Sequence, residues 1–508
     1  MILNLFSPRS DHPLADAREL KRILAELPVD NDAKVVDEVL GWFESLHHVD
    51  DFRVDHYFKV LRQLDEAAQP HLRRLARDYL NSPRLSKVEE RRLWSINYAY
   101  WSEIAGLYAY CLERVRQNPK EKGSDALKSA LPLAAARLLA ARAAQLKWMA
   151  YRYGPIGDEL WRGLGQAYLA AEAAGYLHKS LQLYPQLGGT SAMQQYLQAL
   201  VLHSSSMGSL LPLEIELADR LVAHLLSGFV FSTAVHPDSV YWVDAAQGAA
   251  PVRLARLPGQ VTATLRFFSP GSAPKALNEL IRTVERGDLP GELNLGAPYP
   301  PKVLLPVLRH LALYWAPEPP QREHQRYAVK TRIAVLHGFD DCFTVFAGKV
   351  ARLGKERNAE SWVVENVSLG GFGAGVAELC GEWLKVGALL GMQPEGGDNW
   401  VLGVVRRYSK ESDSQANVGI QSLSRQAQSV ELGPRTSGVS AAEPIPGIWL
   451  REGNGPGEAH LVLPSASFDL REKLEFSHDG RRYLLEPVEL EEHGGDYEIG
   501  RYREYPAD

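Results

Sequence analysis

The sequence predicts a multidomain α+β protein in which a helical N-terminal region precedes a β-rich C-terminal half. The chain has 508 residues, which is more than one hydrophobic core usually serves. Up to about residue 230, good helix formers dominate and apolar residues recur at helical spacing. After Tyr327, short β-branched and aromatic runs alternate with turns rich in Gly, Asn, Asp and Ser.

The clearest helix of the N-terminal region is expected over residues 131–151. This segment is rich in Ala, Leu, Arg and Gln, and Leu139, Ala143, Leu146 and Ala150 fall on one helix face. Similar spacing predicts helices over 37–46, 88–116 and 191–202. We therefore interpret residues 1–230 as a helical interaction domain.

One segment of this region has the spacing of a tetratricopeptide repeat. Trp161, Leu164, Gly165 and Tyr168 follow the pattern W-x2-L-G-x2-Y, in which the glycine would let a second helix approach closely. A second copy at a period near 34 residues is not evident, and an array needs several. An ordinary helix with an aromatic stripe is the favoured interpretation, and a single degenerate repeat is the alternative.

Residues 231–316 have a mixed character. Segments 240–243 and 261–268 are β-branched and aromatic and predict strands, whereas 274–286 and 302–314 predict helices. Pro317, Pro319 and Pro320 then form a short stiff linker. We place a domain boundary there, after a mixed α/β connecting domain.

The remaining chain predicts a small barrel over residues 317–430. Its strands are expected at 327–336, 361–364, 383–390, 400–408 and 418–423. Residues 424–444 lose this periodicity and predict a loop or linker. Alternation returns over 447–503, so residues 431–508 are expected to be a linker and a β-rich extension, which either enlarges the barrel or forms a small appendage.

Two motifs mark the start of this barrel. Arg322 and Arg326 lie four residues apart in the linker, and about forty residues later the stretch from Asn366 to Gly371 has the pattern N-x-S-x-x-G, with Ser368 in third place. Together they resemble the PilZ family, whose members combine an RxxxR linker with [D/N]-x-S-x-x-G in a turn between strands. The resemblance covers about residues 320–430, including Tyr327 after the second arginine and later strands at 402–407 and 418–421.

The resemblance implies a six-stranded antiparallel barrel that binds cyclic di-GMP through Arg322, Arg326, Asn366, Ser368 and Gly371. The residue types suit that ligand, which carries two phosphates and two guanines. An arginine guanidinium can fork onto phosphate oxygens or the guanine O6/N7 edge, and it can stack on the base. The amide and hydroxyl can hydrogen-bond a guanine or a phosphate, and glycine permits a close backbone approach.

Catalysis, a metal site and a cofactor are not expected. The segment 396–400 (GGDNW) lacks the Glu-Phe of a diguanylate cyclase signature and predicts a hairpin turn. The glycines at 371–375 have the wrong spacing for a dinucleotide fingerprint and predict a glycine-rich strand. A cluster of His and Asp residues at 47–56 is interpreted as charged loop residues and helix caps, and three scattered cysteines form no CxxC pair.

These observations favour a bacterial, cytoplasmic second-messenger receptor. A formal net charge of −6 argues against a nucleic-acid partner, and neither a signal peptide nor an apolar run long enough to span a membrane is evident. The helical region is expected to contact a protein partner. The alternative is an adaptor for a pilus, flagellar or secretion system whose barrel binds no nucleotide.

Overall fold

The computed structural model describes residues 10–81, 85–185, 187–291, 293–318, 324–348, 359–434, 444–452 and 455–507. The chain divides into two compact units. The first contains Met1–Arg152 and Ile156–Pro320, and the second contains Tyr153–Pro155 and Gln321–Asp508. The mixed segment 231–316 therefore lies in the same unit as the preceding helices.

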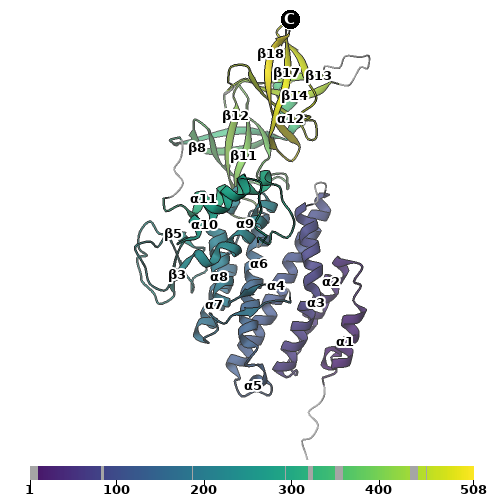
Figure 1. The fold of residues 1–508 in the computed structure, drawn as a ribbon, viewed down its shortest axis with the longest axis vertical. Helices are drawn as coiled ribbons and strands as arrows, with labels where there is room; N and C mark the ends of the chain where they lie inside the picture. The colour runs from purple at the N-terminus through teal and green to yellow at the C-terminus, as the bar shows by residue number, and fades with distance from the viewer. Residues whose placement is uncertain are drawn as a thin grey trace, which may run out of the picture. The chain divides into compact units, whose positions relative to one another are not determined.

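The first unit is mainly helical, which confirms the expected helical N-terminal region (Figure 1). Side chains begin several helices: the hydroxyls of Ser86 and Ser191 and the amide of Asn31 accept hydrogen bonds from the first turn of α4, α8 and α2. The helices are α1 (Ala17–Glu26), α2 (Asp32–Leu46), α3 (Val54–Asn81), α4 (Lys87–Gln117), α5 (Ser124–Leu127), α6 (Leu131–Tyr151), α7 (Asp158–Ala173), α8 (Ala192–Ser204), α9 (Pro212–Leu225), α10 (Ala273–Glu285) and α11 (Pro301–Trp315).

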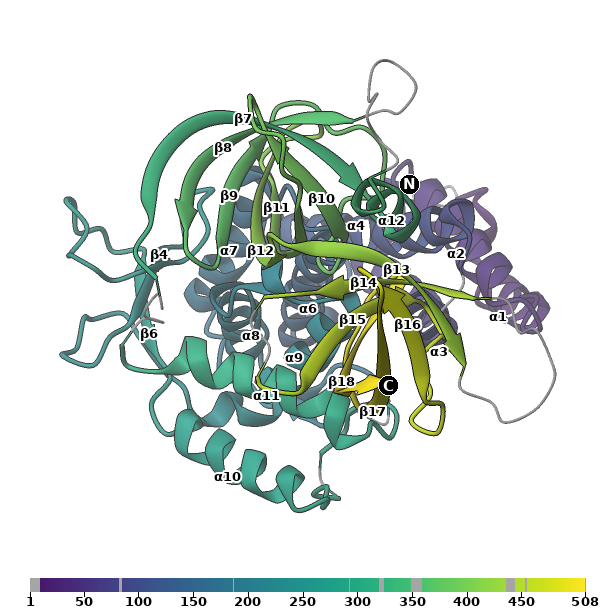
Figure 2. The ribbon, with the colours of Figure 1, turned by 90° about the horizontal axis from the view of Figure 1, so that it is seen from above.

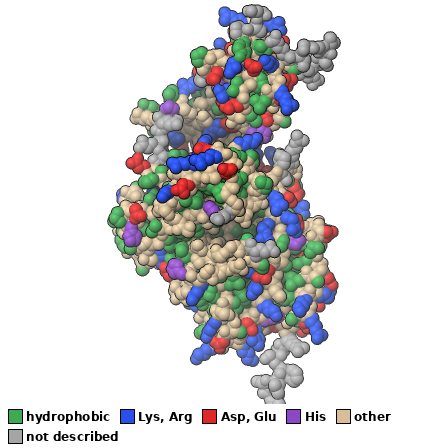
Figure 3. Space-filling model, in the orientation of Figure 1, with side chains coloured by type: hydrophobic (Ala, Val, Ile, Leu, Met, Phe, Trp, Pro, Cys, Tyr) green, Lys and Arg blue, Asp and Glu red, His purple; other side chains and the backbone are tan. Residues whose placement is uncertain are grey.

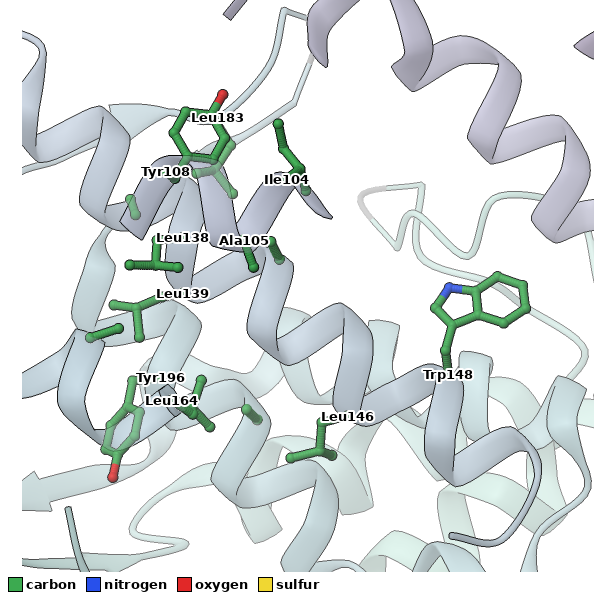
Figure 4. Close-up of a cluster of buried hydrophobic side chains, with 14 of the residues drawn as sticks. Ile104, Ala105, Tyr108, Leu138, Leu139, Leu146, Trp148, Leu164, Leu183 and Tyr196 are labelled. Atoms are coloured by element: carbon green, nitrogen blue, oxygen red, sulfur yellow. The ribbon is translucent and has the colours of Figure 1, made fainter. Parts of the chain in front are cut away.

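Helix α6 lies at the centre of this unit, with α4, α7, α8 and α9 packed around it. Its sequence is apolar almost all round, as expected of a helix surrounded by others. Figure 4 shows Leu138, Leu139 and Leu146 of α6 among buried residues of α4, α7 and α8. The expected helix at 131–151 is confirmed with the same ends.

A buried ionic network joins α3, α4 and α6. The Asp65 carboxylate is fully buried and accepts hydrogen bonds from the hydroxyls of Tyr100 and Tyr108, each at 2.7 Å. The Arg137 guanidinium is also buried and approaches Asp65 to 3.1 Å, while it donates to the Leu183 carbonyl oxygen at 2.9 Å. Each buried charge thus has both an opposite charge and hydrogen-bond partners.

The first unit also carries a two-stranded ribbon, β1 (Leu181–Gln182) and β2 (Gly189–Thr190), and a four-stranded sheet of order β3-β6-β4-β5. The sheet strands are β3 (Val230–Ser232), β4 (Tyr241–Asp244), β5 (Val252–Arg253) and β6 (Leu265–Ser269).

The backbone that follows β4 explains why residue 165 on α7 is a glycine. A Cβ there would lie 2.0 Å from the Ala245 carbonyl oxygen. The residue that approaches this glycine closely is thus in a loop after a strand, and not in the second helix that the tetratricopeptide alternative would require.

The second unit begins with a closed six-stranded antiparallel barrel of order β10-β11-β12-β9-β8-β7, as expected. Its interior is apolar, and Trp362, Val364, Val405 and Ile420 are among the buried residues. The strands are β7 (Tyr327–His337), β8 (Glu360–Ser368), β9 (Gly371–Val376), β10 (Leu389–Pro394), β11 (Val401–Lys410) and β12 (Ala416–Ser424). The expected strand at 383–390 is misplaced, because β10 begins only at Leu389.

The C-terminal extension is a second closed barrel, of order β13-β14-β15-β18-β17-β16. It is larger than the expected appendage and does not enlarge the first barrel. The expected loop at 424–444 is also wrong in part, because β13 lies within it and buries Val430 and Leu432. The strands are β13 (Ala427–Pro434), β14 (Ile445–Leu450), β15 (Glu458–Pro464), β16 (Leu474–His478), β17 (Arg481–His493) and β18 (Tyr497–Ala507).

The two barrels share a hydrophobic core, with helix α12 (Phe339–Phe346) at their junction (Figure 2). Leu389, Leu402 and Val404 of the first barrel pack there with Ile448 and Val462 of the second. Their neighbours Leu390 and Val405 point into the first barrel. Strands β10 and β11 are therefore buried on both faces, which explains their nearly continuous apolar runs.

Candidate functional site

Four of the five residues expected to bind a ligand fall at one end of the first barrel. Arg322 lies outside the described residues. Arg326 is exposed and immediately precedes β7. Asn366 and Ser368 lie near the end of β8, and Gly371 begins β9.

Strand pairing brings the two motifs together. Tyr327 pairs with Val367, and Ala328 pairs with Asn366, so the chain enters β7 beside the N-x-S segment. Ser368 then pairs with Gly371 across the tight turn between β8 and β9. The start of β7, directly after the first motif, thus lies beside the second motif, although the two are about forty residues apart in the chain.

A side chain within the RxxxR segment also reaches the turn. The imidazole of His324 lies 3.1 Å from where a Cβ of Gly370 would be, which is closer than ordinary van der Waals contact. His324, two residues before Arg326, therefore packs against the Ser368–Gly371 turn. Any larger residue at Gly370 would push His324 away from it.

Gly371 is required by backbone packing. A Cβ there would lie 2.0 Å from the carbonyl oxygen of Ile420 on β12. This atom belongs to the β9–β12 ladder, in which Gly371 pairs with Gln421, and it cannot rotate away as a side chain could. Glycine thus fixes the position of the turn relative to β12.

The Asn366 side chain lies flat on β9. Its amide nitrogen and oxygen are 2.6 and 2.7 Å from where a Cβ of Gly373 would be. The amide oxygen is buried and accepts no hydrogen bond from the described residues. Because an unsatisfied buried acceptor is costly, this oxygen is available to a donor that enters the site.

Ser368 is already partly engaged, because its hydroxyl donates to the Gly371 carbonyl oxygen at 3.3 Å. The contact is long for a hydroxyl donor, so the same group can turn towards a ligand. Ser368 and Asn366 thus supply a hydroxyl and an amide at the same end of β8.

The outer face of β9 consists of glycines. Phe372, Ala374 and Val376 pack on the barrel interior, and by alternation Gly371, Gly373 and Gly375 face outward. A face without Cβ atoms lets a flat group lie close to the backbone. The expected glycine-rich strand at 371–375 is confirmed.

Arg406 and Gln421 border this face. The Arg406 Nε donates to the Gln421 Oε1 at 2.7 Å, and its two Nη atoms bind the Glu492 carboxylate of the second barrel at 2.8 and 2.5 Å. Although burial disfavours the charged form, Glu492 raises the pKa of Arg406. This arginine is thus held as a permanent cation between the barrels.

Sequence reasoning missed His324, Gly373 and Gln421. Only Gly373 was open to prediction, because glycines at positions i, i+2 and i+4 of one strand indicate a bare face. The contacts of His324 and Gln421 depend on pairing between strands that are far apart in the sequence.

The other candidate groups have structural roles. His47 contacts Glu103 at 2.8 Å, and His56 contacts the Leu14 carbonyl oxygen at 2.9 Å. In the described part of the chain, no group of three or more metal-ligating side chains is close enough to hold an ion. Segment 396–400 lies between β10 and β11, as the expected hairpin turn requires. Cys380 is exposed, whereas Cys111 and Cys342 are buried.

The surface shows both signs of charge. On the face in Figure 3, Lys and Arg side chains are interspersed with Asp and Glu over both units. Within the described residues, no helix is long and apolar enough to cross a membrane.

Comparison with known proteins gives a match in the N-terminal helical region and not in the barrels. Residues 18–235 match the family model described as "Cyclic-di-GMP receptor FimW, N-terminal domain". The helical region, for which the sequence suggested no family, is therefore similar to a domain of a cyclic-di-GMP receptor. The match does not extend to the barrel whose motifs resemble PilZ. No curated protein and no solved structure matches the chain.

Proposed function

We propose that the protein is a cytoplasmic cyclic di-GMP receptor and that its first barrel is a PilZ-like domain. The ligand would contact Arg322, Arg326, Asn366, Ser368 and Gly371. One observation supports the proposal: residues 324–326, the described end of the RxxxR segment, lead into the strand that pairs beside Asn366, and His324 contacts Gly370 of the N-x-S-x-x-G turn.

The chemistry of the site suits a guanine dinucleotide. The exposed Arg326 can fork onto a phosphate or a guanine edge, and Arg322 would act in the same way. The unpaired Asn366 amide oxygen can accept a hydrogen bond from the guanine N–H groups. The glycine face of β9 would let a base lie close to the backbone.

The family match supports the same ligand from independent residues. Residues 18–235 are similar to the N-terminal domain of a cyclic-di-GMP receptor, and they contain none of the five proposed ligand residues. We propose a receptor without enzymatic activity, in which the helical unit contacts a protein partner.

Isothermal titration of the full chain with cyclic di-GMP tests this proposal. We expect binding, and we expect Arg326→Ala to weaken it about 10- to 100-fold, because the guanidinium makes more than one charged hydrogen bond. Arg326→Lys should fall between the two, since lysine keeps the charge but not the planar fork. Arg332→Ala is the matched control, because Arg332 is exposed on β7, six residues after Arg326, and its side chain hydrogen-bonds only Ser361 among the described residues.

Absence of binding at high nucleotide concentration would overturn the proposal. The adaptor alternative would then be preferred, in which the barrels have only a structural role. Equal losses for Arg326→Ala and Arg332→Ala would instead show that binding does not involve the RxxxR segment.

A further inference from the structure

A groove of about 770 Å³ lies on the helical unit. Helices α4 and α7 both pack closely against α6, and residues of all three line the groove, so it lies over α6 between the other two. Its floor includes Leu131, Ala135 and Leu138 of α6, which are buried. The walls are apolar too, with Val115 on α4 and Ala171 on α7.

The groove is long enough to hold about three turns of a helix. The α7 wall runs from Gly163 to Ala174, which is about 16 Å at 1.5 Å per residue, or about three helical turns. Six of the wall residues are small, so the backbone of an added helix could come close to them. They are Ala109, Gly163, Ala167, Ala170, Ala171 and Ala174.

The charged residues lining the groove are mostly cations. Arg116 is bound by Glu113, and Lys128 is bound by Asp125. Arg142 differs from both. It contacts the neutral Gln145 at 3.0 Å, its Nε is buried without a hydrogen bond, and no carboxylate of the described chain pairs with it.

The position of Arg142 is unfavourable without a further partner. Its guanidinium packs against Gly163 of α7, with closest atoms 3.4 Å from where a Cβ of that glycine would be. Burial lowers the pKa of Arg142, and only Tyr98 opposes that effect. A half-buried cation beside an apolar floor is stabilised by an incoming carboxylate.

We propose that this groove binds an amphipathic helix of a protein partner, with its apolar face on α6 and an acidic side chain paired with Arg142. The groove between two helices suits a third helix in the same layer, and the Arg142 guanidinium, which has no carboxylate partner among the described residues, favours an acidic one. The proposal does not depend on nucleotide binding by the barrel.

The test uses the full chain and two fluorescent helical peptides of about 16 residues, the length that spans the groove with short ends. Both carry Leu at positions i, i+3, i+7 and i+10. One has Glu beside the Leu stripe, and the other has Lys at the same places. Fluorescence anisotropy should show that the Glu peptide binds more tightly, by about tenfold.

Two pairs of variants locate the binding. Ala170→Trp fills the groove and should weaken the Glu peptide by at least about tenfold, whereas Ala173→Trp should not, because Ala173 is exposed on α7 outside the groove. Arg142→Gln should remove the preference for Glu over Lys, and Arg309→Gln on α11 is its control. Unchanged circular dichroism would show that each variant folds.

Three results would overturn the proposal. They are absence of binding by both peptides, binding that Ala170→Trp leaves unchanged, and dimerisation of the chain that Ala170→Trp abolishes in sedimentation. The last result would assign the groove to a second copy of this chain.

Discussion

Alanine at Gly373 and alanine at Gly371 should have different effects, although both glycines face outward on β9. At Gly373 the new methyl group would meet the end of the Asn366 side chain at 2.6 Å. At Gly371 it would meet the backbone oxygen of Ile420 at 2.0 Å. A side chain can rotate away from such a contact, but a ladder carbonyl cannot move without breaking strand pairing.

The expected magnitudes follow from these contacts. Gly373→Ala should change stability by less than about 1 kcal/mol, because the strain of moving Asn366 is offset by the lower backbone entropy cost of alanine in a strand. It should weaken cyclic di-GMP about five- to tenfold, because one hydrogen bond of about 1 kcal/mol is lost. Gly371→Ala should cost about 1–3 kcal/mol or more, as overpacking against fixed atoms does.

Thermal unfolding and isothermal titration of both variants measure the two effects separately. The reasoning is refuted at Asn366 if Gly373→Ala binds nucleotide as tightly as the parent protein. It is refuted at the β9–β12 register if Gly371→Ala unfolds at the parent temperature. Gly375→Ala serves as a control for unfolding only, because its nearest contact is the flexible Glu365 carboxylate at 3.1 Å and it lies on the same glycine face.

Two further predictions concern the helical unit. Arg137→Met leaves the Asp65 charge buried without its cation, which should lower the free energy of unfolding by about 3–5 kcal/mol. For a unit of roughly 300 residues, this loss lowers the thermal unfolding midpoint by about 4–8 °C, which far-ultraviolet circular dichroism can follow. The control is Arg309→Met at an exposed arginine, which should cost less than about 1 kcal/mol. Burial against Trp161 lowers the pKa of His203 from 6.5 to about 4, so the unfolded chain binds this proton more readily. The stability that neutral His203 contributes is therefore present above pH 6.5 and is lost as pH falls towards 4, by about 3 kcal/mol, and His203→Gln should remove that part of the pH dependence.

The helices were predictable because their signals are local. Segment 131–151 has high helix propensity, regular spacing and clear ends, and it became α6 without change. Alternation along the chain likewise predicted β7 and β12. Short strands with turn signals predicted a small barrel, and the resemblance to PilZ implied that it has six strands, which are β7 to β12.

The failures occurred where tertiary contacts override local preference. Helix α12 has an aromatic and β-branched sequence, but Asp496 of the second barrel accepts a hydrogen bond from the Phe339 N–H at 2.8 Å, and Cys342 is buried in the shared core. Strand β13 buries only Val430 and Leu432 deeply among Gln, Ser, Gly and Pro, so its alternation is too short to recognise.

The candidate site was predictable in its residue types but not in its neighbours. Arg326, Asn366 and Gly371 followed from motif spacing, and the structure places them at one end of the barrel. The contact between the Asn366 side chain and Gly373 depends on a register irregularity between β8 and β9, and sequence spacing does not reveal that irregularity.

Because the two barrels share one core, each barrel should depend on the other for its stability, as the subunits of an obligate dimer do. A fragment that ends before β13 would expose Leu389, Leu402 and Val404 as an adhesive apolar surface. Because the two halves are covalently joined, each meets its partner at a high and constant effective concentration. Arg406, which contacts Gln421 near the proposed nucleotide site and Glu492 on the second barrel, would also lose its counter-ion in such a fragment. The smallest portion suited to testing the proposed site is thus the barrel pair.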